Sequence, residues 1–268
     1  MGMRSKPFQR VDVFVDFLCP YCGKFHSIWG EKLHFLEKRG YIKVKYHPLA
    51  WIDRFSQGTM YSTRSASAAD LIAREEPEYL WDFICIMFDR NNQPKEADRY
   101  NTETGSNAKI AQHALEAGVS QELANHIASA DFEGCDEIVA SETERVIELN
   151  KVEYTPTIKI NGVVWKYTEP VDISCLDGLT DFQAAVLQVI ADIKCGNVLT
   201  YGEVAKLAGY PKACRAVGSV CRTNPLPLII PCHRVVPTQY IANPCIQTVG
   251  EYALGADMKW ELLLSESK

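Results

Sequence analysis

The feature that most constrains the fold is an apolar strand that runs straight into an amphipathic helix. The segment "VDVFVDFL" (11–18) is an alternating to continuous apolar run, typical of a buried strand. The next segment, "CPYCGKFHSIWGEKLHFLEKRG" (19–40), carries apolar residues at helical spacing and ends at a glycine. A strand followed directly by such a helix favours a sheet with helices packed on it, so we predict an α/β domain.

Three further patterns complete this domain. "YIKVKYHPLA" (41–50) alternates as a second strand, and residues 63–149 are rich in helical patterns separated by polar breaks. "TPTIKINGVVWKY" (155–167) reads as a strand, an Asn-Gly turn and another strand, which predicts a β-hairpin. We therefore predict an α/β domain with a helical insertion over residues 1–170, followed by a linker at 171–179.

A second, smaller domain is predicted over residues 180–268. "TDFQAAVLQVIADI" begins with Thr180 as a plausible N-cap and continues as an amphipathic helix. "YGEVAKLAGYPKACRAVGSVCRTNP" (201–225) contains two short helices separated by a Gly-Tyr-Pro turn, which predicts a helix-turn-helix. Its second helix is expected from about Lys212 to Arg222. This domain is mainly α and winged-helix-like.

Charge is distributed unevenly along the 268 residues, whose net charge is −6. The stretch from Val204 to Gly250 contains no acidic residue, although it holds several basic ones. An acid-free basic stretch favours a nucleic-acid partner, with a modestly basic surface as the alternative. The basic residues of this stretch are Lys206, Lys212, Arg215, Arg222 and Arg234.

The cysteines and the apolar runs indicate the compartment. Ten cysteines are present, but only Cys19 and Cys22 form a close pair, so we expect reduced thiols rather than a disulfide framework. No apolar run is long enough to predict a membrane span. The first residues lack the apolar core of a signal peptide before the first strand. We therefore expect a cytoplasmic protein that makes no membrane contact.

The pair Cys19 and Cys22 predicts thiol redox chemistry. A cysteine at the start of a helix lies near the positive end of the helix dipole, which lowers its pKa from about 8.5 and favours the thiolate. The second cysteine, one turn later, can attack a mixed disulfide and release the product. A zinc site with His26 and a simply packed pair are the alternatives. The second Cys-x-x-Cys that would complete a zinc site is missing, so we expect no metal and no cofactor.

"FVDFLCPYCGKFH" and the later "YTPTIKING" resemble the DsbA-like branch of the thioredoxin superfamily, whose members are thiol–disulfide oxidoreductases related to protein disulfide isomerase. The resemblance covers about residues 10–165 and implies a thioredoxin-like fold, with Cys19, Cys22 and a cis Pro156 at the active site. It also implies protein or small thiol and disulfide substrates. Many relatives carry a buried acid six residues before the first cysteine. Val13 holds that position here, and Asp16 is the nearest acid.

A second candidate site lies in "NPLPLIIPCHRVV" (224–236), where Cys232 stands beside His233 in a segment held by three prolines. Neighbouring side chains of an extended backbone point in opposite directions. We therefore expect His233 to reach the Cys232 sulfur through a water or a bend. The alternative is a buried, inert pair.

"TYGEVAKLAG", "PKACRAVG", "NPLPLIIPCHRVV" and "MKWELLLSE" together resemble the catalytic domain of O6-alkylguanine-DNA alkyltransferases, the methylated-DNA–protein-cysteine methyltransferases. The resemblance covers residues 179–268 and implies that Cys232 accepts the alkyl group. It further implies that His233 is a water-linked base oriented by Glu266, and that Asn224 braces the turn before the active-site strand. The implied partner is double-stranded DNA that contains O6-alkylguanine.

The resemblance also implies how DNA is held. Arg215 would replace a flipped guanine in the base stack, and Tyr201 would crowd the 3′ phosphate. The remaining residues expected to contact DNA lie on or near the second helix: Lys212, Cys214, Gly218 and Arg222. The residues expected to form the substrate pocket are Val235, whose carbonyl would read the guanine amino group together with that of Cys232, and Tyr252 and Ala253.

Two departures from the alkyltransferase pattern follow Cys232. The loop "PTQYIANPCIQT" (237–248) is longer than usual, and the small lid is altered to Ala253-Leu254-Gly255. We interpret the chain as a fusion of a thiol–disulfide oxidoreductase with a single-turnover DNA alkyltransferase. One alternative is a redox protein whose second domain binds alkylated DNA without transfer. A second alternative is a regulator that uses only the helix-turn-helix.

Overall fold

The computed structural model of the chain describes residues 9–56, 58–94, 106–129, 134–149 and 152–267. These residues form two compact units. The dithiol unit consists of Asp12–His34 and Lys45–Thr157, and it contains the Cys19–Cys22 pair. The PCHR unit, named after residues 231–234, consists of the residues up to Val11, Phe35–Val44 and the chain from Ile158 onward.

A four-stranded sheet has the strand order β2-β1-β3-β4. Strand β1 is buried at six of its seven residues, which explains its nearly continuous apolar sequence. Strands β3 and β4 are antiparallel, and the turn between them is Asn161-Gly162 with φ of 48° and 87°. A two-residue turn of this kind needs positive φ at both positions, and the predicted hairpin is confirmed. The strands are β1 (Gln9–Val15), β2 (Ile42–Pro48), β3 (Thr157–Ile160) and β4 (Val163–Trp165).

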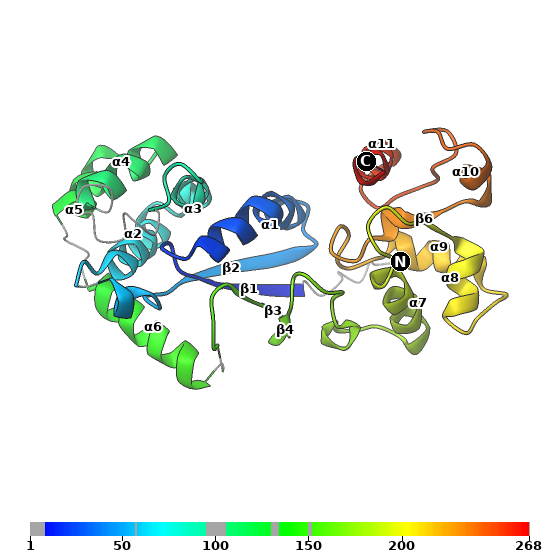
Figure 1. Ribbon diagram of the computed structural model, residues 1–268, viewed down its shortest axis with the longest axis horizontal. Coiled ribbons are helices and arrows are strands. Elements are labelled where there is room, and N and C mark those ends of the chain that lie inside the picture. Colours follow the sequence, from blue (N-terminus) through cyan, green and yellow to red (C-terminus); the bar gives the residue numbers. More distant parts are fainter. Residues whose placement is uncertain (1–8, 57, 95–105, 130–133, 150–151, 268) are drawn as a thin grey trace, which may run out of the picture. The chain divides into compact units, whose positions relative to one another are not determined.

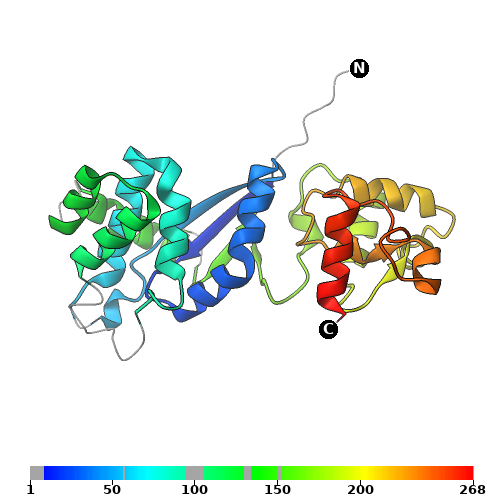
Figure 2. The same ribbon diagram turned by 90° about the horizontal axis from the view of Figure 1, so that it is seen from above.

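Helix α1 (Pro20–Lys38) begins immediately after Cys19, as the sequence predicted. The predicted helical insertion is also confirmed, and helices α2 to α6 gather in one cluster in both views, coloured cyan to green (Figures 1 and 2). Part of this insertion, residues 95–105 and 130–133, lies outside the described residues. The helices are α2 (Tyr61–Glu75), α3 (Leu80–Phe88), α4 (Asn107–Ala117), α5 (Gln121–Ser129) and α6 (Cys135–Leu149), with 3-10 turns η1 (Asp53–Phe55) and η2 (Pro77–Tyr79).

The C-terminal part of the PCHR unit is mainly helical. Thr180 caps α7 through a reciprocal hydrogen-bond pair with Gln183, which confirms the predicted N-cap. Strand β5 pairs in parallel with β6, which follows directly after the PCHR segment. The elements are η4 (Ile173–Cys175), α7 (Asp181–Ala191), β5 (Leu199–Thr200), α8 (Tyr201–Leu207), α9 (Cys214–Arg222), η5 (Cys232–Arg234), β6 (Val235–Val236), α10 (Thr238–Ala242) and α11 (Ala256–Glu266).

The structure corrects two predictions about local conformation. Helix α9 begins at Cys214, and Lys212 lies in the turn before it, where the Ala213 N–H donates to the Tyr210 carbonyl. Cys232–Arg234 form a 3-10 turn rather than an extended strand, closed by the Arg234 N–H on the Pro231 carbonyl. A 3-10 turn separates neighbouring side chains by about a third of a turn instead of placing them on opposite faces.

Two connecting segments also carry structure. The segment predicted as a linker contains η4 and buries Val171, Ile173 and Cys175. The lengthened loop after the PCHR segment contains the short helix α10. Among the described residues, none of the helices has the length and apolar character that crossing a membrane requires.

Candidate active sites

The first site lies where β1 passes into α1. Cys19 precedes the first residue of the helix, and its carbonyl accepts the N–H groups of Cys22 and Gly23 at 3.0 and 3.2 Å. Its Sγ lies 3.4 Å from the Thr155 carbonyl oxygen. The peptide bond between Thr155 and Pro156 is cis, so the structure brings Cys19, Cys22 and Pro156 into one place.

The two thiols of this site differ in proton affinity. The hydrogen bond from Cys22, against the effect of burial, lowers the pKa of Cys19 to about 6, and Thr155 and backbone N–H groups contribute. Burial raises the pKa of Cys22 well above its usual value, and its interaction with Cys19 raises it further. At neutral pH Cys19 is therefore mainly a thiolate and Cys22 holds its proton. This is the arrangement of an attacking thiol and a resolving thiol.

Asp16 is a buried acid beside this dithiol. Its carboxylate is fully buried and accepts hydrogen bonds from the Leu18 N–H, the Ile52 N–H and the Ser62 hydroxyl, each at 2.8 Å. Burial outweighs these donors and raises the pKa of Asp16 to about 7. The Asp16 N–H also lies 3.5 Å from the Cys22 Sγ. Asp16 can therefore gain or lose a proton near neutral pH next to Cys22.

Gln93 holds the turn around Cys19 in place, a contact that no sequence pattern predicted. Its side-chain amide donates to the carbonyls of Phe17 and Cys19 at 2.9 and 2.8 Å. A side chain at Gly23 would collide with the Gln93 amide, so the glycine makes room for this contact. Gln93 follows α3 and lies more than seventy positions from its partners along the chain, beyond the reach of any local pattern.

His26, the third residue of the zinc alternative, lies among aromatic side chains. The His26 ring lies 5.3 Å from the rings of both Trp81 and Phe88, and its Nδ1 lies 3.5 Å from the Tyr46 hydroxyl. Burial lowers the pKa of His26 to about 4. Within the described ranges, no three His, Cys, Asp or Glu side chains gather as a metal site.

The second site is built around Cys232, which is 1% exposed. Fully buried Asn224, just after α9, donates its amide to the Ile230 carbonyl at 2.9 Å and to the Cys232 Sγ at 3.0 Å. The Asn224 side-chain carbonyl accepts the Leu226 N–H at 3.0 Å. Asn224 thus shapes the segment before the PCHR turn and contacts the sulfur directly.

Glu266, near the end of α11, connects His233 and Arg234. Its Oε1 lies 3.0 Å from His233 Nε2, and its two oxygens accept a bidentate pair from Arg234 at 2.7 and 2.8 Å. Arg234 also donates to the Ile193 carbonyl. Burial opposes the charge of Glu266, but the donors outweigh it and lower its pKa to about 2. Burial lowers the pKa of His233, so its ring is neutral at rest.

These contacts fix the tautomer of His233. An ionised Glu266 accepts a hydrogen bond, so His233 carries its proton on Nε2 and leaves a lone pair on Nδ1. Among the described residues, this Nδ1 is buried and has no hydrogen-bond partner. Burial raises the pKa of Cys232 to about 11, although Asn224 and Lys259 act against it. The site therefore combines a protonated thiol with a free basic nitrogen on the next residue.

Lys259 is a fully buried cation that the sequence reasoning missed. Its Nζ donates to the carbonyls of Val235 and Glu251 at 2.7 and 3.2 Å. Burial lowers the pKa of Lys259 to about 8, and its charge favours the Cys232 thiolate. The spacing of Lys259, Leu263 and Glu266 could have revealed it, because these residues share one face of a helix.

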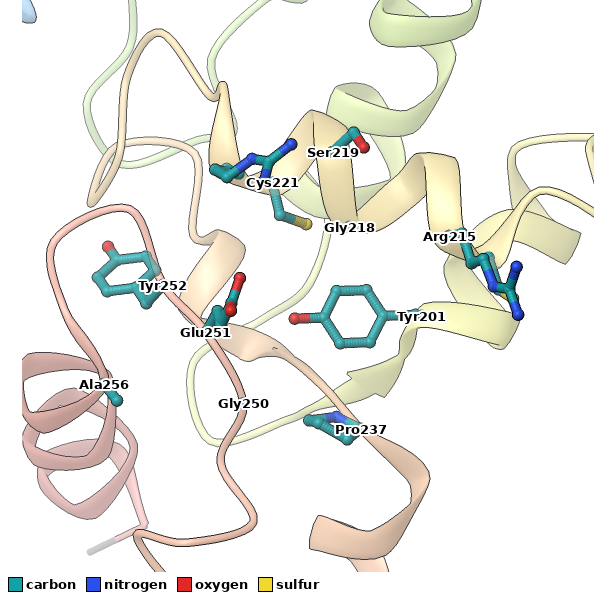
Figure 3. A pocket seen from close by; sticks show the side chains of 12 residues that line it. Tyr201, Arg215, Gly218, Ser219, Cys221, Pro237, Gly250, Glu251, Tyr252 and Ala256 are labelled. Carbon is teal, nitrogen blue, oxygen red and sulfur yellow. The ribbon is translucent and has the colours of Figure 1, made fainter.

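A pocket of about 670 Å³ lies between α9, the start of α8 and the segment before α11 (Figure 3). It brings together most of the predicted DNA-contacting residues, whereas Lys212, Val235 and Ala253 do not line it. Val235 instead gives its carbonyl to Lys259. Cys232 is not among the described residues that line it, but its buried Sγ lies 3.7 Å from the carbonyl oxygen of the lining residue Cys221. The lining residues are Tyr201, Cys214, Arg215, Gly218, Ser219, Cys221, Arg222, Pro237, Gly250, Glu251, Tyr252 and Ala256.

Two known families match the chain, one after the other. Residues 5–181 match the family described as Thioredoxin. Residues 181–268 match the family described as 6-O-methylguanine DNA methyltransferase, DNA binding domain.

Curated relatives match the C-terminal part. The methylated-DNA–protein-cysteine methyltransferase of Methanosarcina mazei is 44% identical over 87 residues, which are 32% of this chain and 51% of that protein. The human protein of the same name is 46% identical over 74 residues, 28% and 32% of the two chains. The bifunctional transcriptional activator/DNA repair enzyme Ada of Escherichia coli is 40% identical over 89 residues, 33% and 23% of the two chains. The chain spans about half the length of these relatives or less.

Solved structures resemble the thioredoxin-like fold. The reduced disulfide bond oxidoreductase DsbG of Mycobacterium tuberculosis has a TM-score of 0.52 and 22% identity, over 82% of this chain and 88% of that one. Reduced DsbA of the same organism has a TM-score of 0.51 and 22% identity, over 82% and 92%. At this identity the likeness shows the fold.

The Glu266 contacts predict a pH-dependent contribution to stability. The pKa of Glu266 is about 2 in the folded chain and 4.5 in its ordinary state, so the folded form favours the carboxylate. This stabilisation is complete above pH 4.5 and disappears as the pH falls through 2. We expect Glu266→Gln to lower the free energy of unfolding at pH 7, with a loss that shrinks below pH 4.5. Chemical denaturation across this range measures it.

The matched control is Glu261→Gln on the exposed surface of the same helix. An equal loss for both variants, or a loss for Glu266→Gln that does not change with pH, contradicts the assignment.

Proposed function

Because the chain belongs to the thioredoxin family and ends in a segment that matches the DNA-binding domain of 6-O-methylguanine DNA methyltransferase, we propose that it combines two thiol chemistries. Residues 1–170 form a thiol–disulfide oxidoreductase domain, 171–179 connect the two, and residues 180–268 form a DNA repair domain. The repair domain transfers the alkyl group of O6-alkylguanine to Cys232. Because DNA is the substrate, the chain works in the cytoplasm.

The observation that carries the repair half is the neutral His233 held by Glu266 beside a buried, protonated Cys232. A thiol with a pKa near 11 is a poor nucleophile at neutral pH, so it must lose its proton when it reacts. His233 Nδ1 takes this proton, directly or through a water, and Glu266 stabilises the imidazolium. Arg234 keeps Glu266 in place through both carboxylate oxygens.

The transfer is a single displacement. The Cys232 sulfur forms a bond to the alkyl carbon, and the bond between that carbon and guanine O6 breaks. The electron pair stays on guanine, which receives the proton that left the thiol, so both products are neutral. Asn224 and Lys259 stabilise the sulfur while it carries negative charge. The resulting thioether does not hydrolyse, so each chain reacts once.

The pocket supports a DNA substrate. Tyr201 projects its ring into the space below α9, and Arg215 lies on the first turn of that helix (Figure 3). A guanine rotated out of the duplex would enter beside Tyr252 while Arg215 fills its place in the stack. Basic Arg222 lines the same pocket, which suits a phosphate backbone. In this proposal Gly218 gives the backbone of α9 close access to DNA.

The oxidoreductase half rests on the opposite pKa shifts of Cys19 and Cys22. The Cys19 thiolate attacks a substrate disulfide and forms a mixed disulfide, and one substrate thiolate leaves. Cys22 then attacks Cys19, which releases the second substrate thiol and leaves a Cys19–Cys22 disulfide. Asp16 titrates near neutral pH and serves as the buried group that exchanges a proton with Cys22.

A labelled duplex tests the repair half. Protein in excess over DNA that carries radiolabelled O6-methylguanine should remove the label, and Cys232→Ser should abolish removal. His233→Gln should slow removal by about 100-fold or more, the usual contribution of a general base. Cys195→Ser, at an exposed cysteine of the same unit, is the matched control and should react like the unchanged chain.

Tight binding of the methylated duplex without any transfer would contradict this proposal and favour a domain that only recognises lesions. Neither the sequence matches nor the buried thiol–histidine pair favours that alternative.

Disulfide reduction tests the other half. With insulin as substrate and a dithiol as electron donor, the rate should rise with the Cys19 thiolate and reach half its maximum near pH 6. Cys19→Ser should abolish the activity, whereas Cys175→Ser, at a buried cysteine outside the site, should retain it. Equal activity of the Cys19→Ser chain would show that the dithiol is not the reactive group.

A further inference from the structure

A second thiol lies at the acceptor site, and the alkyl-transfer mechanism does not use it. Cys221 is in the last turn of α9, and its sulfur points into the pocket (Figure 3). Cys232 is buried next to it, and its Sγ donates to the Cys221 carbonyl at 3.7 Å. The two cysteines are therefore neighbours at the pocket wall: the Cys221 sulfur points into the pocket, and the Cys232 sulfur contacts the Cys221 backbone.

Both thiols are buried, and Cys232 is close enough to change the pKa of Cys221. Burial raises the pKa of Cys221, the nearby Cys232 raises it further, and Lys259 acts in the opposite direction. Burial raises the pKa of Tyr201, on the far side of the pocket, and both sulfurs raise it further. Cys214 lines the same pocket but lies at the opposite end of α9, about 10 Å along the helix axis. Among the pocket thiols, Cys221 is the one placed beside Cys232.

We propose that Cys221 is a resolving thiol for Cys232, and that the resulting Cys221–Cys232 disulfide is a substrate of the Cys19–Cys22 dithiol. The first step concerns the PCHR unit alone and does not require alkyl transfer. The second step rests on the proposed oxidoreductase function. The substrate of the dithiol in this step is the Cys221–Cys232 disulfide of another copy of the chain or of the same copy.

The oxidant of the first step is a hydroperoxide. The Cys232 sulfur attacks one peroxide oxygen, the O–O bond breaks, and Cys232 becomes a sulfenic acid. The Cys221 sulfur then attacks the Cys232 sulfur, and hydroxide leaves with the Cys221 proton as water. With hydrogen peroxide the two thiols lose two electrons and two protons, and the peroxide is reduced to two waters.

The second step is an ordinary exchange. The Cys19 thiolate attacks the Cys221–Cys232 disulfide, one sulfur of the pair leaves as a thiolate, and Cys22 then releases the other. The pair returns to two thiols, and Cys19 and Cys22 become a disulfide. One disulfide is reduced while the other dithiol is oxidised, so the exchange needs no other oxidant or reductant.

This pairing has a physical consequence for an acceptor that works once. A sulfenic acid without a partner thiol oxidises further to sulfinic acid, which thiols cannot reduce. A disulfide with Cys221 stops at a reversible stage. It also occupies the sulfur that would attack the alkyl carbon, so transfer ceases until the disulfide is reduced.

Peptide mapping tests the first step. The full chain with Cys19→Ser and Cys22→Ser, which removes the other dithiol, is treated with two equivalents of hydrogen peroxide, enough to oxidise a lone thiol to sulfinic acid, and then blocked with N-ethylmaleimide. We expect a Cys221–Cys232 cross-linked peptide that a small dithiol reverses. Adding Cys214→Ser should leave the cross-link unchanged, whereas adding Cys221→Ser should remove it and convert Cys232 to sulfinic acid.

A Cys232 disulfide with any other cysteine overturns the first step. Sulfinic acid at Cys232 while Cys221 stays free also overturns it. Both results are read in the chain that retains Cys221, so they do not depend on how the Cys221→Ser chain folds. Mapping also needs no DNA, so a failure of alkyl transfer would not be mistaken for a failure of this step.

Mixing two full-length variants tests the second step. The oxidised Cys19→Ser/Cys22→Ser chain is incubated with reduced Cys232→Ser chain, which retains the dithiol but has no acceptor. We expect free Cys232 to reappear, and a donor that also carries Cys19→Ser should restore none. If the donor reduces insulin but not this disulfide, the substrate assignment is wrong. If it reduces neither, the oxidoreductase function itself fails.

Discussion

A sulfur atom removed from water keeps its proton unless hydrogen-bond donors or positive charge replace the lost solvation, and both candidate sites are arranged around this constraint. Cys19 and Cys232 are almost equally buried, at 4% and 1% exposure, yet their pKa values shift in opposite directions. Cys19 receives several donors at the start of a helix, and its thiolate forms near pH 6. Cys232 receives the Asn224 amide and the charge of Lys259, which offset only part of the cost of burial. The first thiol is therefore reactive at rest, whereas the second needs a base.

This difference suits the two thiol chemistries proposed for the chain. Exchange with disulfides must be repeatable. A cysteine that is already a thiolate at neutral pH can attack the substrate disulfide, and its protonated neighbour can then release the product. An acceptor that reacts once benefits from staying protonated until substrate is in place, because a thiol resists oxidation and unwanted alkylation better than a thiolate. His233 can supply the base, and because its ring is neutral at rest it adds no positive charge of its own next to the sulfur. In the redox cycle that we propose, the neighbouring Cys221 would add a reversible stage to the oxidation of Cys232.

The sequence predicted those parts of the molecule that local patterns determine. Three predicted features are determined by residues only a few positions apart, and all three are confirmed: the apolar strand before Cys19, the Asn161-Gly162 turn and the Thr180 cap. The close approach of Glu266 to His233 was implied only by the resemblance to alkyltransferases. Gln93 and Lys259 were missed because their partners are distant in sequence and the contacts form only after folding. The strand predicted at the PCHR segment was wrong, because the closure of a 3-10 turn on Pro231 outweighed the apolar pattern.

The most direct test of two separate thiol chemistries in one chain is to locate the alkyl group after reaction. The reduced, unmodified protein is incubated with a duplex that contains radiolabelled O6-methylguanine, free thiols are blocked, and the digested peptides are separated and counted. We predict that the label is on the peptide that contains Cys232, at no more than one methyl group per chain, while Cys19 and Cys22 are recovered unmethylated. Label on Cys19, Cys221 or Cys214, or no label on any cysteine when protein is in excess, would contradict it.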